Sequence, residues 1–181
     1  LPNVVAAEAR RPHAARVAVG DDTPEQATVW GVDVGATDID VVRVDSGSAP
    51  GPGQVLVDGG NDQAGEDARP GDRVEVTGAG GAPTTLEVSG TGGSLATSPT
   101  ASPDYYVDPG MAHRLAGDET VDQILLRLRD ARPAAADATV DAARDVLRQA
   151  AGHDVVTGLP TVREPGDWPG RDLVEQITSL F

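Results

Sequence analysis

Apolar and polar residues alternate with a period of two in much of the first half of the chain, a pattern typical of half-buried β-strands. Residues 73–77 and 85–89 show it most clearly, and the Gly- and Pro-containing segment 78–83 between them predicts a β-hairpin. Four of its side chains share the predicted buried face: Val74, Val76, Leu86 and Val88.

Shorter β-branched runs predict the other strands of this half. Residues 16–19 and 27–32 flank a turn-like segment at 20–24 and predict a second hairpin. Further strands are predicted at 3–9, 39–44 and 54–57. The Gly, Pro, Ser and Thr content of residues 45–53 and 90–103 predicts loops.

The period changes to that of helices after residue 107. Asp108 followed by Pro109 predicts a helix start and Gly117 its end, with Met111 and Leu115 facing inward. A second helix is predicted at 137–151, capped by Asp137, ended by Gly152 and carrying an apolar stripe: Ala136, Val140, Ala143, Leu147 and Ala150.

Two strands are predicted on either side of this second helix. Residues 121–129 place Ile124, Leu126 and Leu128 on one face, and residues 155–157 are β-branched. Strand, helix and strand predict a βαβ unit with parallel strands and a right-handed crossover. The fold class expected from the whole pattern is α+β.

The two ends suggest that the chain is a piece of a longer protein. It opens at Leu1 without an initiator Met or a signal peptide. Its last segment has an apolar stripe of helical period, which fits either a helix entering a membrane or an amphipathic helix packed on the core: Leu173, Val174, Ile177, Leu180 and Phe181. No uninterrupted apolar run is long enough to span a bilayer.

Composition narrows the function classes. The formal net charge is −15, with 29 acidic and 14 basic residues, all of the latter Arg. Nucleic-acid binding requires a basic face, so the charge argues against it, and also against a peripheral lipid-binding surface. The acidic bias could mark a metal-binding surface, but a solvated acidic surface is the favoured interpretation. The absence of Cys excludes disulfides, thiolate metal sites and Cys nucleophiles.

Each candidate for chemistry fails one requirement of its motif. Segment 78–81 has no following helix to bind phosphate, and Ser94 leads into Thr and Pro rather than the helix of a nucleophile elbow. His13, His113 and His153 lack ligand spacing and are expected at helix ends or in loops. Segment 58–62 departs from the EF-hand pattern, and Asp38 and Asp40 are expected on a solvated strand face. The sequence therefore predicts no catalytic, cofactor-binding or metal-binding residues, no cofactor and no enzyme activity.

The order of several segments resembles the FtsX-like ABC transporter permeases. The opening Leu1-Pro2-Asn3-Val4 is similar to the entry that follows a membrane helix in that family. Residues 70–76 with 86–90 resemble the family's "G-D-x-V-x-V … L-x-V-x-G" hairpin, and residues 121–128 resemble its "v-d-q-i-l-v-r-l" strand. Tyr106-Val107-Asp108 with residues 115–117 fits the helix between them.

This resemblance implies a MacB-like periplasmic core domain on the extracytoplasmic side of the cell membrane. The absence of Lys and the high Ala, Asp, Arg and Gly content resemble an actinobacterial protein, with a haloarchaeal one as the less favoured alternative. Residues 1–181 would form one such domain, with a β-rich lobe at about 45–100 inserted in a membrane-proximal βαβ lobe formed by about 1–44 and 101–181. The implied role is to transmit ATP-driven conformational change to a substrate or partner outside the membrane. The implied partners are an ABC ATPase subunit, an extracytoplasmic protein or peptide, and a second copy of the permease. Two alternatives remain open: a secreted or surface α+β ligand-binding or adhesion module, and an enzyme fragment.

Overall fold

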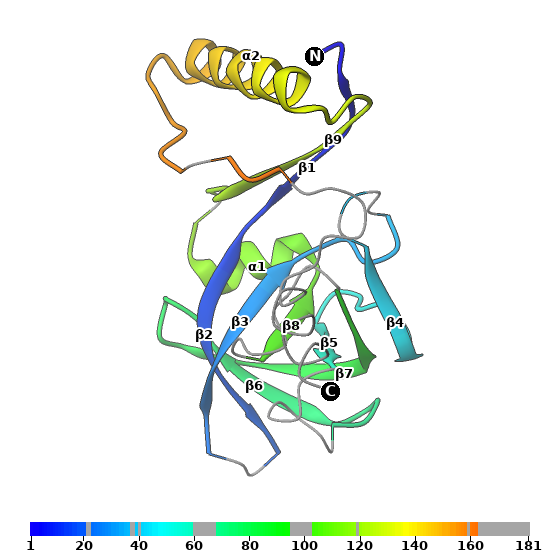
Figure 1. The fold of residues 1–181 in the computed structure, drawn as a ribbon. Helices are drawn as coiled ribbons and strands as arrows, with labels where there is room; N and C mark the ends of the chain where they lie inside the picture. The colour runs from blue at the N-terminus through cyan, green and yellow to red at the C-terminus, as the bar shows by residue number, and fades with distance from the viewer. Residues whose placement is uncertain are drawn as a thin grey trace, which may run out of the picture.

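The larger of two β-sheets closes on itself. The computed structural model describes residues 1–20, 23–36, 39, 41–59, 68–94, 103–118, 120–158 and 160–162. Seven strands form the sheet in the order β4-β7-β5-β8-β3-β2-β6, and β6 also pairs with β7 (Figure 1). Among the described strands, β4 pairs only with β7 and takes no part in the closure. The other six strands form a closed ring. Their bounds are β2 Pro12–Val19, β3 Glu25–Gly31, β4 Val42–Gly47, β5 Gln54–Asp58, β6 Arg73–Thr77, β7 Pro83–Ser94 and β8 Asp104–Val107.

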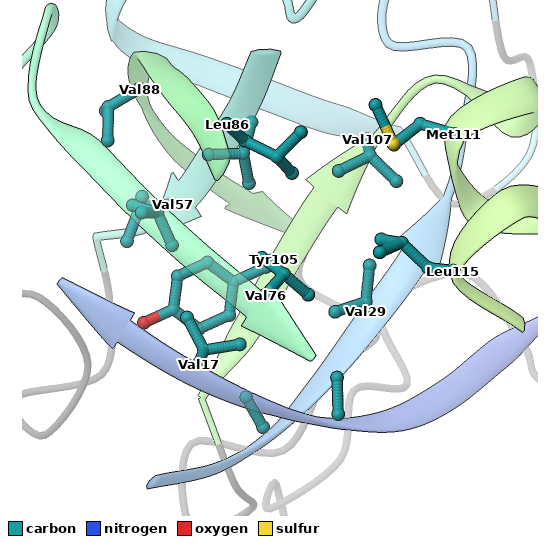
Figure 2. Close-up of a cluster of buried hydrophobic side chains, with 14 of the residues drawn as sticks. Val17, Val29, Val57, Val76, Leu86, Val88, Tyr105, Val107, Met111 and Leu115 are labelled. Carbon is teal, nitrogen blue, oxygen red and sulfur yellow. The ribbon is translucent and has the colours of Figure 1, made fainter. Parts of the chain in front are cut away.

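The main hydrophobic core fills the inside of this closed sheet. Side chains at alternate strand positions point inward and are almost fully buried (Figure 2), among them Val17, Val29, Val57, Val76, Leu86, Val88, Tyr105 and Val107. Helix α1, Pro109–Ala116, contributes Met111 and Leu115 to the same core. Its predicted ends are confirmed: the Asp108 side chain accepts from the Met111 N–H, and Gly117 has the left-handed backbone of a C-cap.

A second apolar cluster lies on the outer face of the closed sheet. Leu56 and Tyr106 point outward from β5 and β8 and are buried by the segments around Val32 and Val42. Trp30, at the edge of this cluster, donates from Nε1 to Oδ1 of Asp104 at 2.7 Å, which gives this buried carboxylate a partner. Strand β4 is therefore held by side-chain packing as well as by its ladder to β7.

The smaller sheet has two strands, β1 (Val4–Arg10) and β9 (Gln123–Leu128), which pair antiparallel. Helix α2, Pro133–Ala151, lies over this sheet (Figure 1). Asn3 links strand and helix: its Nδ2 donates to the Asp130 carbonyl and to Thr139 Oγ1, both at 2.9 Å, and its Oδ1 accepts from the Asp130 N–H. One side chain thus holds the first turns of α2 against the start of β1.

The α+β class is confirmed, but the predicted βαβ unit is wrong. Residues 155–157 are not in a strand, and the strand beside β9 is β1, from the other end of the chain. Strand β1 pairs with β9 over six residue pairs, which the three residues 155–157 after α2 could not do. Among the residues that the structure describes, α2 therefore forms no parallel crossover.

Helix α2 begins earlier than predicted. Its first residue is Pro133, not one after Asp137, because Pro is favoured at the first helical position, where no N–H is required. Gly152 ends it as predicted, in the left-handed conformation. Leu126, Leu128 and Leu147 are half-buried, whereas Ile124, predicted to share one face with Leu126 and Leu128, is 48% exposed.

Both predicted hairpins of the larger sheet are confirmed, as β2–β3 and β6–β7. The loop expected at 90–103 is wrong for residues 90–94, which continue β7; residues 95–102 lie outside the described residues. Residues 45–47, predicted to open a loop, extend β4, and strand β8 has no counterpart among the predicted strands. The glycines that predicted a loop are required in the strand, because Gly90 and Gly92 lie against the backbone of β4. A Cβ at these two positions would come within 2.1 and 2.0 Å of carbonyl oxygens.

The two sheets do not coincide with the predicted lobe boundaries at about 45 and 100, since the larger sheet includes β2 and β3 before them and β8 after them. The division of the chain into lobes stays a prediction. The predicted stripe at 173–181 lies outside the described residues. Among the residues that the structure does describe, no helix combines the length and apolar character needed to cross a bilayer.

Candidate functional site

The described chain passes between the two sheets at two places. One is Arg11, between β1 and β2; the other lies between α1 and β9, where residues 117, 118 and 120–122 are described. The two passages touch, because the Asp122 N–H donates to the Arg10 carbonyl at 3.2 Å. We call the region formed by residues 10–12, 117, 118 and 120–122 the junction.

The first passage is one extended run that changes its pairing partner. Up to Arg10 it pairs with β9, and from Pro12 onward it pairs with β3. Pro12 has no N–H to offer a ladder and restricts the preceding Arg11 to extended conformations. The run therefore stays extended while it leaves one sheet and enters the other (Figure 1).

Arg10 is the buried basic residue of the junction, with a side chain 2% exposed. Its Nε donates to Oε1 of Glu8 at 2.7 Å, and its Nη2 donates to the Ile39 carbonyl at 2.9 Å. It thereby ties β1 to the segment that follows β3 in the chain. Because both groups are largely desolvated, the charged hydrogen bond is stronger than it would be on the surface.

Arg11 connects the two passages through its side chain. Its Nη1 donates to Oδ1 of Asp118, and its Nε lies 3.6 Å from Oδ2 of Asp122, an ion pair too long for a hydrogen bond. Asp118 is fixed in turn by Thr120, whose N–H and hydroxyl donate to the same Oδ1 at 2.8 and 2.7 Å. The Arg11 side chain is 17% exposed, whereas those of Asp118 and Asp122 are 48% and 53% exposed.

A shallow cleft of about 270 Å³ lies beside the junction, where β1 faces the larger sheet. Its walls come from both parts of the molecule: β1 on one side, and the segment after β3 with the start of α1 on the other. The lining residues include Ala6, Glu8, Gly31, Asp33, Ile39 and Pro109. A change in the angle between the sheets would change the size of this cleft.

Among the described residues, the segments whose catalytic, phosphate-binding or metal-binding motifs were incomplete in the sequence lie on separate elements of the fold. Gly78–Gly81 is the tight turn of the β6–β7 hairpin, with the Gly81 N–H donating to the Gly78 carbonyl at 3.0 Å. Ser94 ends β7, and its N–H donates to the Tyr106 hydroxyl. Asp38, Asp40 and residues 60–62 lie outside the described residues. Within the described part of the chain, no three His, Asp or Glu side chains gather as metal ligands.

The three His residues lie on three different elements. His113 is in the last turn of α1, and His153 follows α2, as expected for helix-end residues. His13 corrects the expectation, because it lies within β2 and is half-buried, with neither ring nitrogen hydrogen-bonded.

Titratable groups with shifted pKa values do not converge either. Burial, aided by the charge of Arg11, lowers the pKa of His13 in β2. Burial, with a smaller effect of Glu25, raises the pKa of Tyr105 in β8 to about 12. Hydrogen bonds from Arg132 lower the pKa of Asp130, on the surface before α2, to about 2. A catalytic centre usually brings such groups together, and these three belong to separate elements.

The junction was missed because its signal is weak in sequence. Arg10-Arg11-Pro12 interrupts an otherwise apolar strand region, and charges followed by Pro were open to interpretation as a simple strand end. The partners of Arg11 lie far along the chain, at a separation of 107 residues for Asp118, and no local spacing links them.

The fold resembles three solved structures: an extracellular domain of a transporter, a periplasmic region and a domain of a putative permease. The extracellular domain of the noncanonical ABC-type transporter YknZ from Gram-positive bacteria matches with a TM-score of 0.62 and 16% identity, over 84% of this chain and 79% of that one. The periplasmic region of MacB from Actinobacillus actinomycetemcomitans matches with a TM-score of 0.59 and 12% identity, over 85% and 71%. A domain of a putative permease protein from Porphyromonas gingivalis matches with a TM-score of 0.53 and 13% identity, over 98% and 81%.

No protein-family model and no curated protein matches the sequence. At these identities the likeness concerns the fold: the chain has the fold of the extracytoplasmic domains of MacB-like ABC transporter permeases. The fold that the resemblance implied is thereby confirmed.

Proposed function

We propose that the chain is the extracytoplasmic domain of an ABC transporter permease subunit and that it transmits ATP-driven conformational change to a substrate or partner outside the membrane. The observation that carries this proposal is the fold shared with the extracellular domain of YknZ and the periplasmic region of MacB, each matched over most of both chains. The domain of a putative permease that also matches supports it.

The architecture supports a transmitting role. The described chain has two sheets with separate hydrogen-bond ladders, joined at a narrow junction. A displacement applied to the β1–β9 sheet would reach the larger sheet through the residues of the junction. Hinge motions in proteins usually take place at short connections between two rigid bodies.

The remaining parts of the proposal follow from this role. An ABC ATPase would supply the energy, and two copies of the permease would act together. The β-rich lobe would meet an extracytoplasmic protein or peptide, while the lobe containing β1 would lie next to the membrane. The domain would do mechanical rather than catalytic work.

Labelling from outside the cell tests the location. The chain has no Cys, so a single Ala138→Cys on the exposed side of α2 creates one thiol in this domain. In intact cells that express the full-length parent protein without other thiols, a membrane-impermeant maleimide should label this residue fully.

Met111→Cys is the matched control, since Met111 is 6% exposed and should react only after unfolding. Labelling of Ala138→Cys only after the cells are lysed would contradict the proposal. That result would leave a domain with this fold on the other side of the membrane.

A further inference from the structure

The two junction arginines differ in how firmly they are held. The Arg10 side chain is 2% exposed and reaches both Glu8 and the Ile39 carbonyl. Arg11 is bound to carboxylates that are half exposed to solvent, and its buried Nε has no hydrogen bond. Releasing Arg11 exposes charges that already touch water, whereas releasing Arg10 leaves Glu8 and a carbonyl without partners in the interior.

The positions of the two residues match this difference. Arg10 belongs to the ladder of the smaller sheet and ties it to the Ile39 carbonyl, so it acts at one fixed point. Arg11 stands between the ladders and bridges the two chain passages. Rotation of one sheet relative to the other would move the two passages past each other and would first stretch the contacts of Arg11.

We propose that Arg11, with Asp118 and Asp122, is a latch that sets the angle between the two sheets, and that Arg10 is the fixed pivot next to it. With the latch closed the sheets keep one orientation. With it open the β1–β9 sheet swings about residues 10–12, and the cleft lined by Glu8 and Asp33 widens. This inference deepens the proposed transmitting role and rests on it, but its test needs only the 181-residue chain.

Salt should control the latch. Ion pairs with half-exposed carboxylates are screened by salt, because the Debye length falls from about 30 Å at 0.01 M to about 3 Å at 1 M. A buried pair such as Arg10–Glu8 is screened far less. High salt should therefore open the latch and leave the pivot intact.

Spin-label distances measure the angle directly. One label at Ala138→Cys in α2 and one at Glu75→Cys in β6, both exposed positions, report the distance between the two parts. Labels at Glu75→Cys and Ser48→Cys, both on the larger sheet side, form the control pair. Arg43→Gln is the matched variant, since Arg43 pairs with Asp45 on the surface away from the junction.

At low salt the wild-type distance distribution between the two parts should be narrow. It should broaden or shift with Arg11→Gln and with high salt, and high salt should add nothing to Arg11→Gln. Arg11→Lys, which keeps the charge, should recover part of the narrow distribution. Arg43→Gln and the control pair should not change.

Asp118→Asn combined with Asp122→Asn provides a second route if Arg11→Gln does not fold. The side-chain amide oxygen introduced by Asp118→Asn would still accept from Thr120, so this variant removes charge and leaves the local turn. A distribution unchanged by the removal of either side of the latch in a folded chain overturns the inference. It would leave the proposed permease role standing, because that role is tested by labelling in cells.

Discussion

At the scale of single residues, the junction depends on charged groups that the fold has removed from water. Arg10 is the clearest case, with a side chain 2% exposed and a partner, Glu8, whose Oε2 already lacks a hydrogen bond. Removing one member of such a pair leaves the other charge buried and uncompensated.

Arg10→Gln should therefore lower the free energy of unfolding by about 3–5 kcal/mol, the usual loss for a broken buried pair. Arg43→Gln, at a pair whose side chains are 78% and 49% exposed, should cost less than about 1 kcal/mol. Urea unfolding followed by circular dichroism measures both. Equal losses in the two variants would mean that Arg10 is not a structural centre of the junction.

His13 gives the molecule a pH dependence of known sign. Burial in β2, together with the positive charge of Arg11, lowers its pKa below the ordinary value of 6.5. The unfolded chain then binds the proton more tightly than the folded one, so stability rises with pH in this range. The contribution is present above pH 6.5 and is lost as the pH falls through the lowered pKa.

Unfolding midpoints measured from about pH 7.5 to about pH 5 should therefore decrease on acidification, and His13→Gln should flatten part of that decrease. His153→Gln, at an exposed residue after α2, should keep the wild-type slope. An unchanged slope in His13→Gln would assign the pH dependence to other groups. Asp130 does not interfere, because its pKa of about 2 places its titration at lower pH.

At the scale of elements, α1 depends on a close approach to the β6–β7 hairpin. A Cβ at Gly78 would lie 2.1 Å from the carbonyl oxygen of Leu115, in the last turn of α1. The two backbones touch here, and only Gly permits that distance.

Gly78→Ala should push α1 off the end of the closed sheet and cost about 1–3 kcal/mol, as overpacking usually does. Gly80→Ala is the matched control two residues along the same hairpin, since nothing lies within 4 Å of its Cβ position. Thermal unfolding compares the two. A Gly80→Ala variant as unstable as Gly78→Ala would point to hairpin strain rather than to contact with α1.

Helix α2 buries its apolar stripe only partly. Leu147 is half-buried, and its neighbour Val146 is 53% exposed. Leu147→Ala should cost about 1–2 kcal/mol, below the about 2–5 kcal/mol of fully buried Leu residues. Val146→Ala should change stability by about 0.5 kcal/mol or less. If Val146→Ala costs more than Leu147→Ala in urea unfolding, the helix faces the sheet differently.

Local signals predicted most elements, and long-range pairing limited the rest. The hairpin at Val74 and Leu86 and the caps at Asp108 and Gly117 depend on neighbouring residues, so the sequence sufficed. The β1–β9 pairing joins positions such as Val4 and Leu128, and no local pattern identifies such a partner. The Gly residues of β7 are typical of a loop in sequence because their reason, the backbone of β4, is distant along the chain.

The same limit explains the candidate site. Motifs for catalysis or metal binding have a local spacing that can be tested in the sequence. The contact of Arg11 with Asp118 has none, because it forms only when both sheets are in place. A charged pair that joins distant segments has no periodicity and no fixed spacing. Only the folded structure brings it together.

At the scale of the whole molecule, we expect the two sheets to move against each other when the proposed ATPase uses ATP. The chain carries a formal net charge of −15 and no Cys, so paired labels can be placed without competing thiols in this domain. The β1–β9 sheet would receive the displacement and the closed sheet would deliver it.

The most direct test measures the distance between labels at Ala138→Cys and Glu75→Cys in the full-length permease, reconstituted with its ATPase. We expect the distance distribution to change between the nucleotide-free and the ATP-trapped state, and we expect Arg11→Gln to weaken the difference. The control pair at Glu75→Cys and Ser48→Cys should stay constant. Identical distributions in both nucleotide states, with an ATPase shown to be active in the same sample, would contradict the claim that this domain transmits the change.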